Sequence, residues 1–534
     1  MNVCEILSLR AKQWPIRTAI VDRRKRLSYQ ELETLSAQVA GTLLRQGAAA
    51  RDAALVMVPL SAEFYVTVIA LLRIGAVPVL VDPGQGRSHV EHCCRMIRPR
   101  IWIGSPLAHL LRAVMPCLRR IPLSFCTAGR LPGSRALFTS TAGTAEIRPA
   151  ARDAPALITF TSGSTGTPKA IARSHGFLLA QHSALQQSLA HSPGEIVLSA
   201  LPVFVLSHLA AGLSCVLPAC DLRRPGKIAP DPVITQLAVC GVTSVEAPPS
   251  MLEQIVRRCM KKSKRLAVRR FLVGGAPVFP RLLAQLETIS PGCQVTSVYG
   301  SSEAEPIAHV NASAISPADI SAMQAGEGLL VGTPVSSIGL RILPEGLKTG
   351  TITSRAALER ASLPCGECGE IAVSGSHVLS GYLHEEAEGA PSKFRVDDVV
   401  WHRTGDVGYL DPRGRLWLVG RAGSCADSRG KLYPLAMETA MSFFPAVARS
   451  AFFTRKGQRV LALVVEPGAL EPGAHALPDL PGLAVLFDKM QVDTILKVRM
   501  IPTDKRHNSK IDYRALGGDS RHTSEIGATS TSVL

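Results

Sequence analysis

The chain has 534 residues, which is enough for a large core and for more than one domain, because single domains usually have about 150 residues. Charged residues make up 19% and apolar residues 46% of the chain, and these values exclude a largely disordered protein. The net charge of +17 suits nucleic acid, an anionic membrane surface or an acidic small substrate. Charge alone does not choose among these three partners.

The cysteines predict a reduced, cytoplasmic protein. There are 13 of them, an odd number, and Cys93 and Cys94 are adjacent, which does not suit a disulfide framework. The single C-x-x-C, Cys365 to Cys368, has no second pair and no histidine couple to complete a zinc site, so we interpret it as two loop cysteines. Glu5 interrupts the first apolar run, and no small-residue cleavage site follows, so we expect no signal peptide.

Helix and strand patterns alternate from the start of the chain. Ser28 to Glu33 opens a capped helix that we expect to run to Gly47, and residues 54–59 form a short apolar strand. Residues 64–81 predict a buried helix followed by a strand. This alternation favours an α/β fold. The apolar stretch 198–220 contains two prolines and a glycine, so we expect a strand, a turn and a short helix there and no membrane span.

The C-terminal third continues with a strand at 416–419 and an amphipathic helix at 435–444. A polar segment between them marks a candidate domain boundary near residue 420. The last residues, 517–534, are rich in Gly, Ser, Thr and charges, which predicts a disordered tail.

A glycine- and hydroxyl-rich loop directly follows the predicted strand 156–161. Its two glycines let backbone N–H groups turn toward a phosphate, its hydroxyls add donors, and its lysine adds positive charge. It is not a Walker A loop, in which lysine directly follows the second glycine. A flexible linker is the alternative, but the position after a buried strand disfavours it. The loop reads Thr161-Ser162-Gly163-Ser164-Thr165-Gly166-Thr167-Pro168-Lys169.

This loop resembles the phosphate loop of the adenylate-forming superfamily, which contains acyl-CoA synthetases, peptide-synthetase adenylation domains and luciferases. Further motifs of that superfamily follow in its order over nearly the whole chain. They are Gly274-Gly275-Ala276-Pro277, Tyr299-Gly300-Ser301-Ser302-Glu303, Gly366 to Gly375, Gly381-Tyr382-Leu383, Trp401 to Asp406, Gly420-Arg421 and Asn508-Ser509-Lys510. The resemblance implies a large multi-sheet α/β AMP-binding domain over 1–420, a small α+β lid domain over 421–516, and the tail 517–534.

The resemblance also implies that the chain binds ATP and Mg²⁺. The turn Gly274-Gly275-Ala276 would contact adenine, and Tyr299 offers a flat face on which the base can stack. Glu303 is the expected Mg²⁺ ligand, because Mg²⁺ prefers one or two carboxylates together with phosphate oxygens. Asp406 would accept the ribose hydroxyls. By resemblance Arg421 lies at the ribose and begins the linker, although on its own it reads as a surface charge.

Lys510 is the expected catalytic residue, with Glu303 and Lys169 beside it. In the superfamily the matching lysine reaches from the small domain to the substrate carboxylate and the α-phosphate. A compact cation there can bridge two anions and stabilise negative charge that develops in the transition state. The implied reaction is attack of a carboxylate oxygen on the α-phosphorus of ATP, release of pyrophosphate and formation of an acyl-adenylate.

The acyl acceptor is left open among CoA, a carrier protein and an internal hydroxyl. Val205 stands where many acyl-CoA synthetases have His or an aromatic residue, Gly423 stands at the hinge position, and Asp427 stands where many have Lys in the thioester-stage loop. The closest resemblance is to the fatty-acid CoA ligase branch that includes the β-lactone synthetases of olefin biosynthesis. Stretches 77–87, 400–411, 414–417 and 506–511 support this resemblance. In that branch a β-hydroxy acid is adenylated and its own hydroxyl displaces AMP.

Apolar Phe204, Val205 and Leu206 suggest a hydrophobic carboxylic acid, and the branch adds the β-hydroxy acid as an option. No nucleic-acid recognition motif is present and aromatic residues are scarce, so we expect no nucleic-acid partner. Peripheral association with a membrane or a partner enzyme stays open. The alternative function is a non-catalytic relative that binds nucleotide or a polyanion, which intact Lys169, Glu303, Asp406 and Lys510 disfavour.

Overall fold

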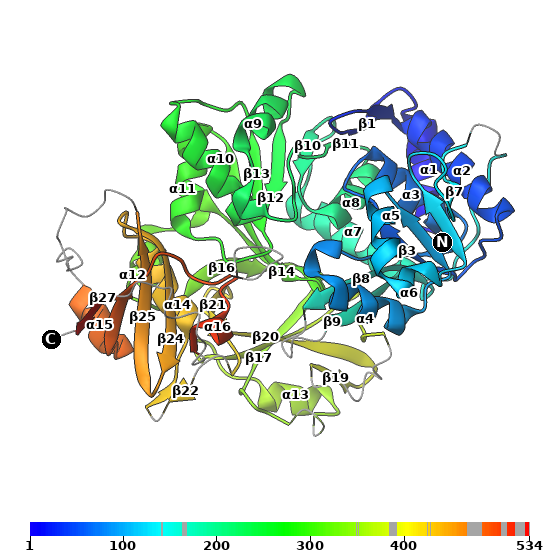
Figure 1. Cartoon of the computed structure of the whole chain (residues 1–534). Coiled ribbons are helices and arrows are strands. Elements are labelled where there is room, and N and C mark those ends of the chain that lie inside the picture. Colours follow the sequence, from blue (N-terminus) through cyan, green and yellow to red (C-terminus); the bar gives the residue numbers. More distant parts are fainter. Residues whose placement is uncertain are drawn as a thin grey trace.

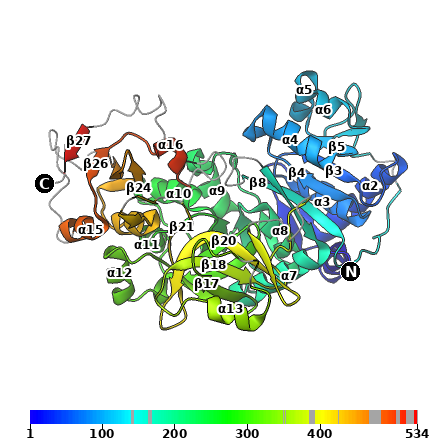
Figure 2. The same ribbon diagram turned by 90° about the horizontal axis from the view of Figure 1, so that it is seen from below.

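The computed structural model describes residues 1–139, 143–162, 168–348, 350, 352–383, 392–423, 426–427, 429–466, 483–503, 510–517 and 529–532. Within these ranges the strands form sheets of seven, fourteen, four and two strands. Figure 1 shows the seven-stranded sheet on the right, the four-stranded sheet on the left, and β14, β16 and β20 of the largest sheet between them. The predicted multi-sheet α/β body with a smaller C-terminal α+β part is confirmed (Figures 1 and 2).

The seven-stranded sheet has the order β7-β6-β5-β3-β4-β8-β9. Its strands are β3 (Ala53–Met57), β4 (Val77–Leu80), β5 (Ile101–Gly104), β6 (Leu123–Cys126), β7 (Arg135–Ala136), β8 (Pro155–Ser162) and β9 (Pro168–Ser174). All neighbours are parallel except β8 and β9, which pair Thr161 with Lys169 in antiparallel register. The predicted phosphate loop therefore connects two antiparallel strands at the edge of this sheet.

The fourteen-stranded sheet has the order β17-β18-β20-β21-β16-β15-β14-β13-β12-β10-β11-β1-β2, with β19 paired to β20. Its strands in chain order are β1 (Thr18–Val21), β2 (Arg26–Ser28), β10 (Ile196–Ser199), β11 (Ser214–Val216), β12 (Ser244–Ala247), β13 (Arg270–Gly274), β14 (Gln294–Ser301), β15 (Ala304–Asn311), β16 (Leu329–Pro334), β17 (Gly339–Leu343), β18 (Gly369–Ser374), β19 (Lys393–Val396), β20 (Val399–Leu410) and β21 (Leu416–Arg421). The run from β11 to β14 is parallel, and from β14 onward the pairing is antiparallel. The change of direction falls at the turn that carries Glu303.

Helices cover these sheets, as both views show. They are α1 (Cys4–Gln13), α2 (Tyr29–Arg45), α3 (Ala62–Arg73), α4 (Arg87–Ile97), α5 (Pro106–Val114), α6 (Pro116–Arg119), α7 (His175–Leu189), α8 (Pro202–Ala211), α9 (Pro230–Val239), α10 (Pro249–Lys261), α11 (Pro280–Ile289), α12 (Pro317–Gln324) and α13 (Arg355–Ala361), with short 3₁₀ turns η1 (Pro83–Gln85), η2 (Pro225–Lys227) and η3 (Ala312–Ala314).

Several local predictions are confirmed. Ser28 caps α2 through a reciprocal capping box with Glu31, which satisfies backbone N–H groups at the helix start. The apolar stretch 198–220 contains the end of β10, then α8 and β11, as its prolines and glycine indicate. No helix in the described ranges is long and apolar enough to span a membrane.

The C-terminal part has its own sheet, of order β24-β25-β26-β27, and a short β22-β23 hairpin. Its elements are β22 (Ala426–Asp427), β23 (Gly430–Lys431), α14 (Pro434–Met441), β24 (Val447–Arg455), β25 (Gln458–Val465), α15 (Leu483–Met490), β26 (Thr494–Lys497), α16 (Tyr513–Gly517) and β27 (Thr529–Ser532). Two apolar clusters draw only on residues from Leu432 onward. A domain boundary near residue 420 stays a prediction, and β21 runs through that point to Arg421.

Two features of this part differ from expectation. All eight residues of α14 are buried, so it is not amphipathic, because β21 lies on one side of it and β24 on the other. Residues 529–532 of the tail that we expected to be disordered form β27, which pairs antiparallel with β26. Alternating Thr and Ser suit a strand at a sheet edge, where β-branched threonine is favoured.

Candidate functional site

The expected ribose contacts meet at one corner of the largest sheet. Asp406 and Arg421 are register partners on β20 and β21, and the Arg421 guanidinium lies 2.9 Å from Asp406 Oδ1. Tyr299, at the end of β14, donates its hydroxyl to Asp406 Oδ2 at 2.8 Å. Gly405 has φ +72°, and a Cβ there would lie 3.2 Å from the Arg421 guanidinium, so glycine permits this close approach. The structure thus brings together three residues that are up to 122 positions apart.

Burial, together with the charge of Asp406, raises the pKa of Tyr299 well above its usual range, so its hydroxyl stays protonated. Asp406 raises the pKa of Arg421, and Glu303 acts in the same direction from farther away. The charge of Glu303 therefore acts on Arg421, which pairs with Asp406.

Glu303 lies in the turn between β14 and β15. Its Oε1 accepts a hydrogen bond of 3.0 Å from the hydroxyl of Tyr382. The ammonium group of Lys169, at the start of β9, lies 4.7 Å from the centre of the Tyr382 ring. The structure therefore brings Lys169 close to Glu303 through Tyr382. Glu303 is partly exposed and its carboxylate suits Mg²⁺ together with phosphate oxygens.

Arg173 was not among the site residues predicted from the sequence. It lies on β9, is only 4% exposed, and donates to Thr159 Oγ1 at 2.7 Å and to the Ser302 carbonyl at 2.9 Å. It thus fixes the Glu303 turn to the strand that precedes the phosphate loop. The signal that could have identified Arg173 is its charge within an otherwise apolar strand.

Lys510 is exposed, and its positive charge acts on Glu305, two residues after Glu303. Burial raises the pKa of Glu305 to about 7, with Arg173 and Lys510 opposing the shift and Glu246 adding to it. Glu305 was also not predicted from the sequence, because it lies just after the Tyr299–Glu303 motif and belongs to no motif itself. The expected contact of Lys510 with the substrate carboxylate and the α-phosphate stays a prediction.

The predicted adenine turn follows β13. A Cβ on Gly274 would lie 2.9 Å from the Val298 carbonyl oxygen, Gly275 has φ +87°, and a Cβ on Gly300 would lie 3.0 Å from the Ala304 carbonyl oxygen. These three positions therefore need glycine. Ala276 follows directly in the same turn. The Ser301 hydroxyl is buried and has no hydrogen-bond partner within the described ranges, whereas the Ser302 carbonyl binds Arg173. An orphaned hydroxyl beside these glycines suits a polar ligand.

Some predicted residues lie outside the described residues. These are Gly163, Ser164, Thr165 and Gly166 of the phosphate loop, and Asn508 and Ser509 beside Lys510. Thr161 and Ser162 are described only as backbone of β8. Their contacts with phosphate stay predictions.

A small, mainly apolar pocket lies between α1, α7 and α8. It is lined among others by Ile6, Leu178, Val203 and Leu206. Phe204 and Val205 do not line it, because Phe204 packs on β13 and β14 and Val205 is fully buried in the core. Of the three apolar residues that suggested a hydrophobic acid, only Leu206 lines this pocket, and binding of the acid there stays a prediction.

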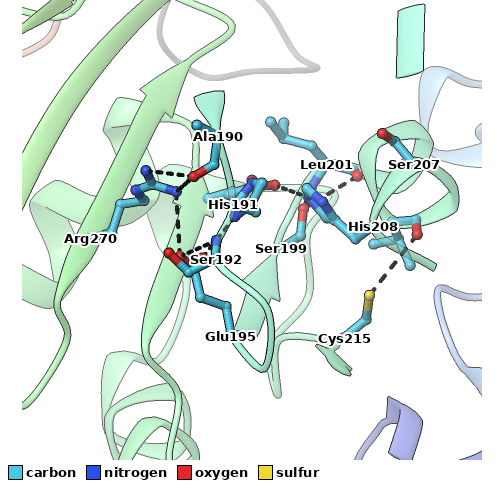
Figure 3. A network of polar contacts seen from close by, with 12 residues as sticks. Ala190, His191, Ser192, Glu195, Ser199, Leu201, Ser207, His208, Cys215 and Arg270 are labelled. Carbon is cyan, nitrogen blue, oxygen red and sulfur yellow. Dashed lines mark hydrogen bonds and ion pairs between the residues drawn. The ribbon is translucent and has the colours of Figure 1, made fainter. Parts of the chain in front are cut away.

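A buried charged cluster holds α8 in place, and no motif predicted it. Glu246 on β12 is completely buried, and its two oxygens bind His208 Nε2 at 2.6 Å and His191 Nε2 at 3.2 Å. The other nitrogen of His191 binds Glu195 at 2.8 Å, and Arg270 lies 3.5 Å from Glu195 (Figure 3). Burial alone would lower the pKa of His191, but its two carboxylate partners raise it to about 9.

Asp427 forms ion pairs with two arginines in the C-terminal part. Its carboxylate binds Arg459 at 2.7 and 3.0 Å and lies 3.3 Å from Arg429. Hydrogen bonds from Arg459 hold the pKa of Asp427 well below its usual range. A lysine at this position would face these two arginines.

Comparisons with known proteins agree with this geometry. Residues 7–383 match the family described as AMP-binding enzyme. The chain is 31% identical to the olefin beta-lactone synthetase of Xanthomonas campestris over 92% of this chain and 90% of that protein. It is 32% identical to the olefin beta-lactone synthetase of Stenotrophomonas maltophilia, again over 92% and 90%.

Solved structures show the same fold at lower identity. The amide bond synthetase McbA from Marinactinospora thermotolerans aligns with a TM-score of 0.78 and 21% identity over 96% of this chain and 99% of that one. The O-succinylbenzoate coenzyme A synthetase of Bacillus subtilis, in complex with AMP, aligns with a TM-score of 0.74 and 20% identity over 97% and 98%. The same synthetase has also been solved with ATP and a magnesium ion. The chain belongs to the AMP-binding enzyme family and is an adenylate-forming, ATP-dependent acid ligase.

Proposed function

We propose that this enzyme adenylates a hydrophobic β-hydroxy carboxylic acid and then closes it to a β-lactone, with AMP as the leaving group. The observation that carries the adenylation step is that Glu303, in the turn after β14, and Asp406, bound to Tyr299 of β14, lie at the same end of that strand. The lactone step is supported by the two relatives named olefin beta-lactone synthetase, which match over 92% of the chain.

In the first step a carboxylate oxygen of the acid attacks the α-phosphorus of ATP, the bond to the β-phosphate oxygen breaks, and pyrophosphate leaves. Asp406 and Arg421 hold the ribose, Tyr299 stacks on the adenine, and Lys169 contributes positive charge near the phosphates. Lys510 reduces the repulsion between the two anions that must meet. Glu303 is the residue that would hold Mg²⁺, and the ion would neutralise charge on the phosphates.

In the second step the β-hydroxyl oxygen attacks the acyl carbonyl carbon. The new C–O bond closes a four-membered ring, the bond to AMP breaks, and the hydroxyl proton is lost to solvent or to the leaving phosphate. Both reacting groups are in one molecule, so the step gains a high effective concentration and needs no CoA. Asp427, bound to two arginines, supports this proposal, because that position then offers no free cation to a CoA phosphate.

The first step is tested by exchange of labelled pyrophosphate into ATP with a panel of carboxylic acids. We expect exchange with medium- and long-chain 3-hydroxy acids. Lys510→Ala should lower kcat by about a hundredfold or more, since loss of one such electrostatic contact has that effect. Lys497→Ala on β26 is the matched control and should exchange like the wild type. Equal rates for both variants would contradict the assigned role of Lys510.

The second step is tested by mass spectrometry of the products with and without CoA. We expect a product that has lost one water from the hydroxy acid, together with AMP, in the absence of CoA. A thioester formed only with CoA, with no lactone, would contradict the lactone step and leave adenylation intact.

We place the enzyme in the cytoplasm, and its cysteines support this location. The described cysteines are all free thiols, and half of them are buried.

A further inference from the structure

The sequence assigns no chemistry to the family motif Gly381-Tyr382-Leu383. In the structure its segment is hydrogen-bonded on both sides. The Leu379 N–H donates to the Glu303 carbonyl at 2.7 Å, and the Leu383 N–H donates to the Ala170 carbonyl at 3.0 Å. Tyr382 is therefore fixed between the turn that carries Glu303 and the strand that begins beside Lys169.

The side chain of Tyr382 contacts charged groups from three elements. Its hydroxyl donates to Glu303 Oε1 at 3.0 Å. The ammonium groups of Lys169 and Lys393 lie 4.7 and 5.9 Å from the centre of its ring. An aromatic ring attracts a cation at such distances through its quadrupole. One side chain thus joins the expected metal ligand and the phosphate-loop lysine.

Lys393 supports the fixed position of the tyrosine. It is 3% exposed, and its ammonium group donates to the Leu379 carbonyl within the same segment. Burial lowers the pKa of Lys393 to about 7, while the negative charge of Glu303 acts in the opposite direction. Lys393 is thus a buried support for the segment, whereas Lys169 is partly exposed.

We infer that Tyr382 is a positioning residue, whose hydroxyl orients the Glu303 carboxylate for Mg²⁺ and whose ring holds Lys169 beside the phosphates. The inference rests on the proposed roles of Glu303 and Lys169. A carboxylate ligand is commonly oriented by a hydrogen bond from an outer group, and removal of that group lowers metal affinity by about 10- to 100-fold. Tyr382 binds Oε1 of Glu303, and within the described residues Oε2 has no hydrogen-bond partner and can turn toward a metal ion.

The test separates the hydroxyl from the ring. In Tyr382→Phe the ring stays and the hydroxyl is lost, so we expect the Mg²⁺ concentration for half-maximal ATP–pyrophosphate exchange to rise about tenfold, with kcat at saturating Mg²⁺ nearly unchanged. In Tyr382→Leu both are lost, so kcat should fall as well. Tyr409→Phe is the matched control. It removes the hydroxyl of a tyrosine on β20 that donates to the Glu327 carbonyl and not to Glu303.

A binding measurement gives a readout that does not depend on turnover. ATP affinity is measured by calorimetry with and without Mg²⁺, in the absence of acid. Tyr382→Phe should lower the gain in affinity that Mg²⁺ provides by about tenfold and leave metal-free ATP binding unchanged.

Two outcomes would overturn the inference. One is a Tyr382→Phe enzyme with wild-type Mg²⁺ dependence. The other is equal loss of ATP affinity with and without Mg²⁺, which would show a general structural role. Failure of the proposed function gives a different result. If the proposed function is wrong, the wild-type enzyme shows no exchange with hydroxy acids, but the Mg²⁺ dependence of ATP binding still tests the role of Tyr382.

Discussion

Glu246 places a carboxylate in the interior of the molecule, 0% exposed, between two imidazole rings. Transfer of such a charge out of water is costly unless partners compensate it. His191 and His208 each bind one of its oxygens, and Glu195 with Arg270 extends the alternation of charges toward the surface. The charges are mutually compensated, so the network fixes α8 against β12.

We therefore expect Glu246→Gln to destabilise the fold by about 3 kcal/mol, because it leaves a protonated imidazole without its buried counter-charge. The measurement is the free energy of unfolding in urea. Glu63→Gln, which breaks the exposed pair with Lys25, is the control and should change stability by less than about 1 kcal/mol. Similar values for the two variants would contradict the buried-charge interpretation.

At the scale of elements, α14 and α16 are joined close in sequence to Lys510, the proposed catalytic residue. Glu438 on α14 is 5% exposed and accepts hydrogen bonds from the Tyr513 hydroxyl on α16 and from the Phe452 N–H on β24. Tyr513 lies three residues after Lys510. This contact therefore anchors the segment that carries Lys510 to the core of the C-terminal part.

Burial raises the pKa of Glu438 to about 8, although its two hydrogen bonds act in the opposite direction. The folded state therefore binds a proton that the unfolded chain releases above about pH 4.5, and this contribution to stability is lost as the pH rises toward 8. Glu438→Gln resembles the protonated form. We expect it to match the wild type near pH 5 and to exceed it in melting temperature near pH 9.

The comparison is made by thermal unfolding across this pH range, with the exposed Glu287→Gln as the control. A variant that is less stable than the wild type at both pH values would show that Glu438 is ionised in the folded protein.

At the scale of the whole molecule, the net charge of +17 acts on every anion that approaches. Few of these positive groups have a proposed task, namely Lys169, which lies against Tyr382, Arg421, which pairs with Asp406, and Lys510. The remaining positive charge adds a long-range attraction for the nucleotide. Salt screens this attraction beyond about 8 Å at physiological ionic strength.

We expect the KM for ATP to rise several-fold between about 50 and 300 mM NaCl, with kcat nearly constant. Salt screening weakens the attraction between the enzyme and ATP, but it does not affect the chemical step in the bound complex. Exchange kinetics at the two salt concentrations check this. A constant KM would show that the surface charge serves another partner.

The sequence by itself predicted the fold class and the family resemblance, which are confirmed, and the roles of Lys169, Glu303, Asp406 and Lys510, which stay predictions. It could do so because each motif is a short contiguous stretch whose glycines, hydroxyls and charges have a local physical reason. The glycines at 274, 275 and 405 are examples, since close approach or positive φ requires them.

Only the tertiary structure decided which of these residues support one another. Tyr382 meets Glu303 across 79 positions, Arg173 meets Ser302 across 129, and His208 meets Glu246 across 38. These contacts depend on strand register and on the change from parallel to antiparallel pairing at β14. Long-range pairing is set by packing of the whole core, so residues such as Arg173, Glu305 and Glu246 have no local pattern that predicts them.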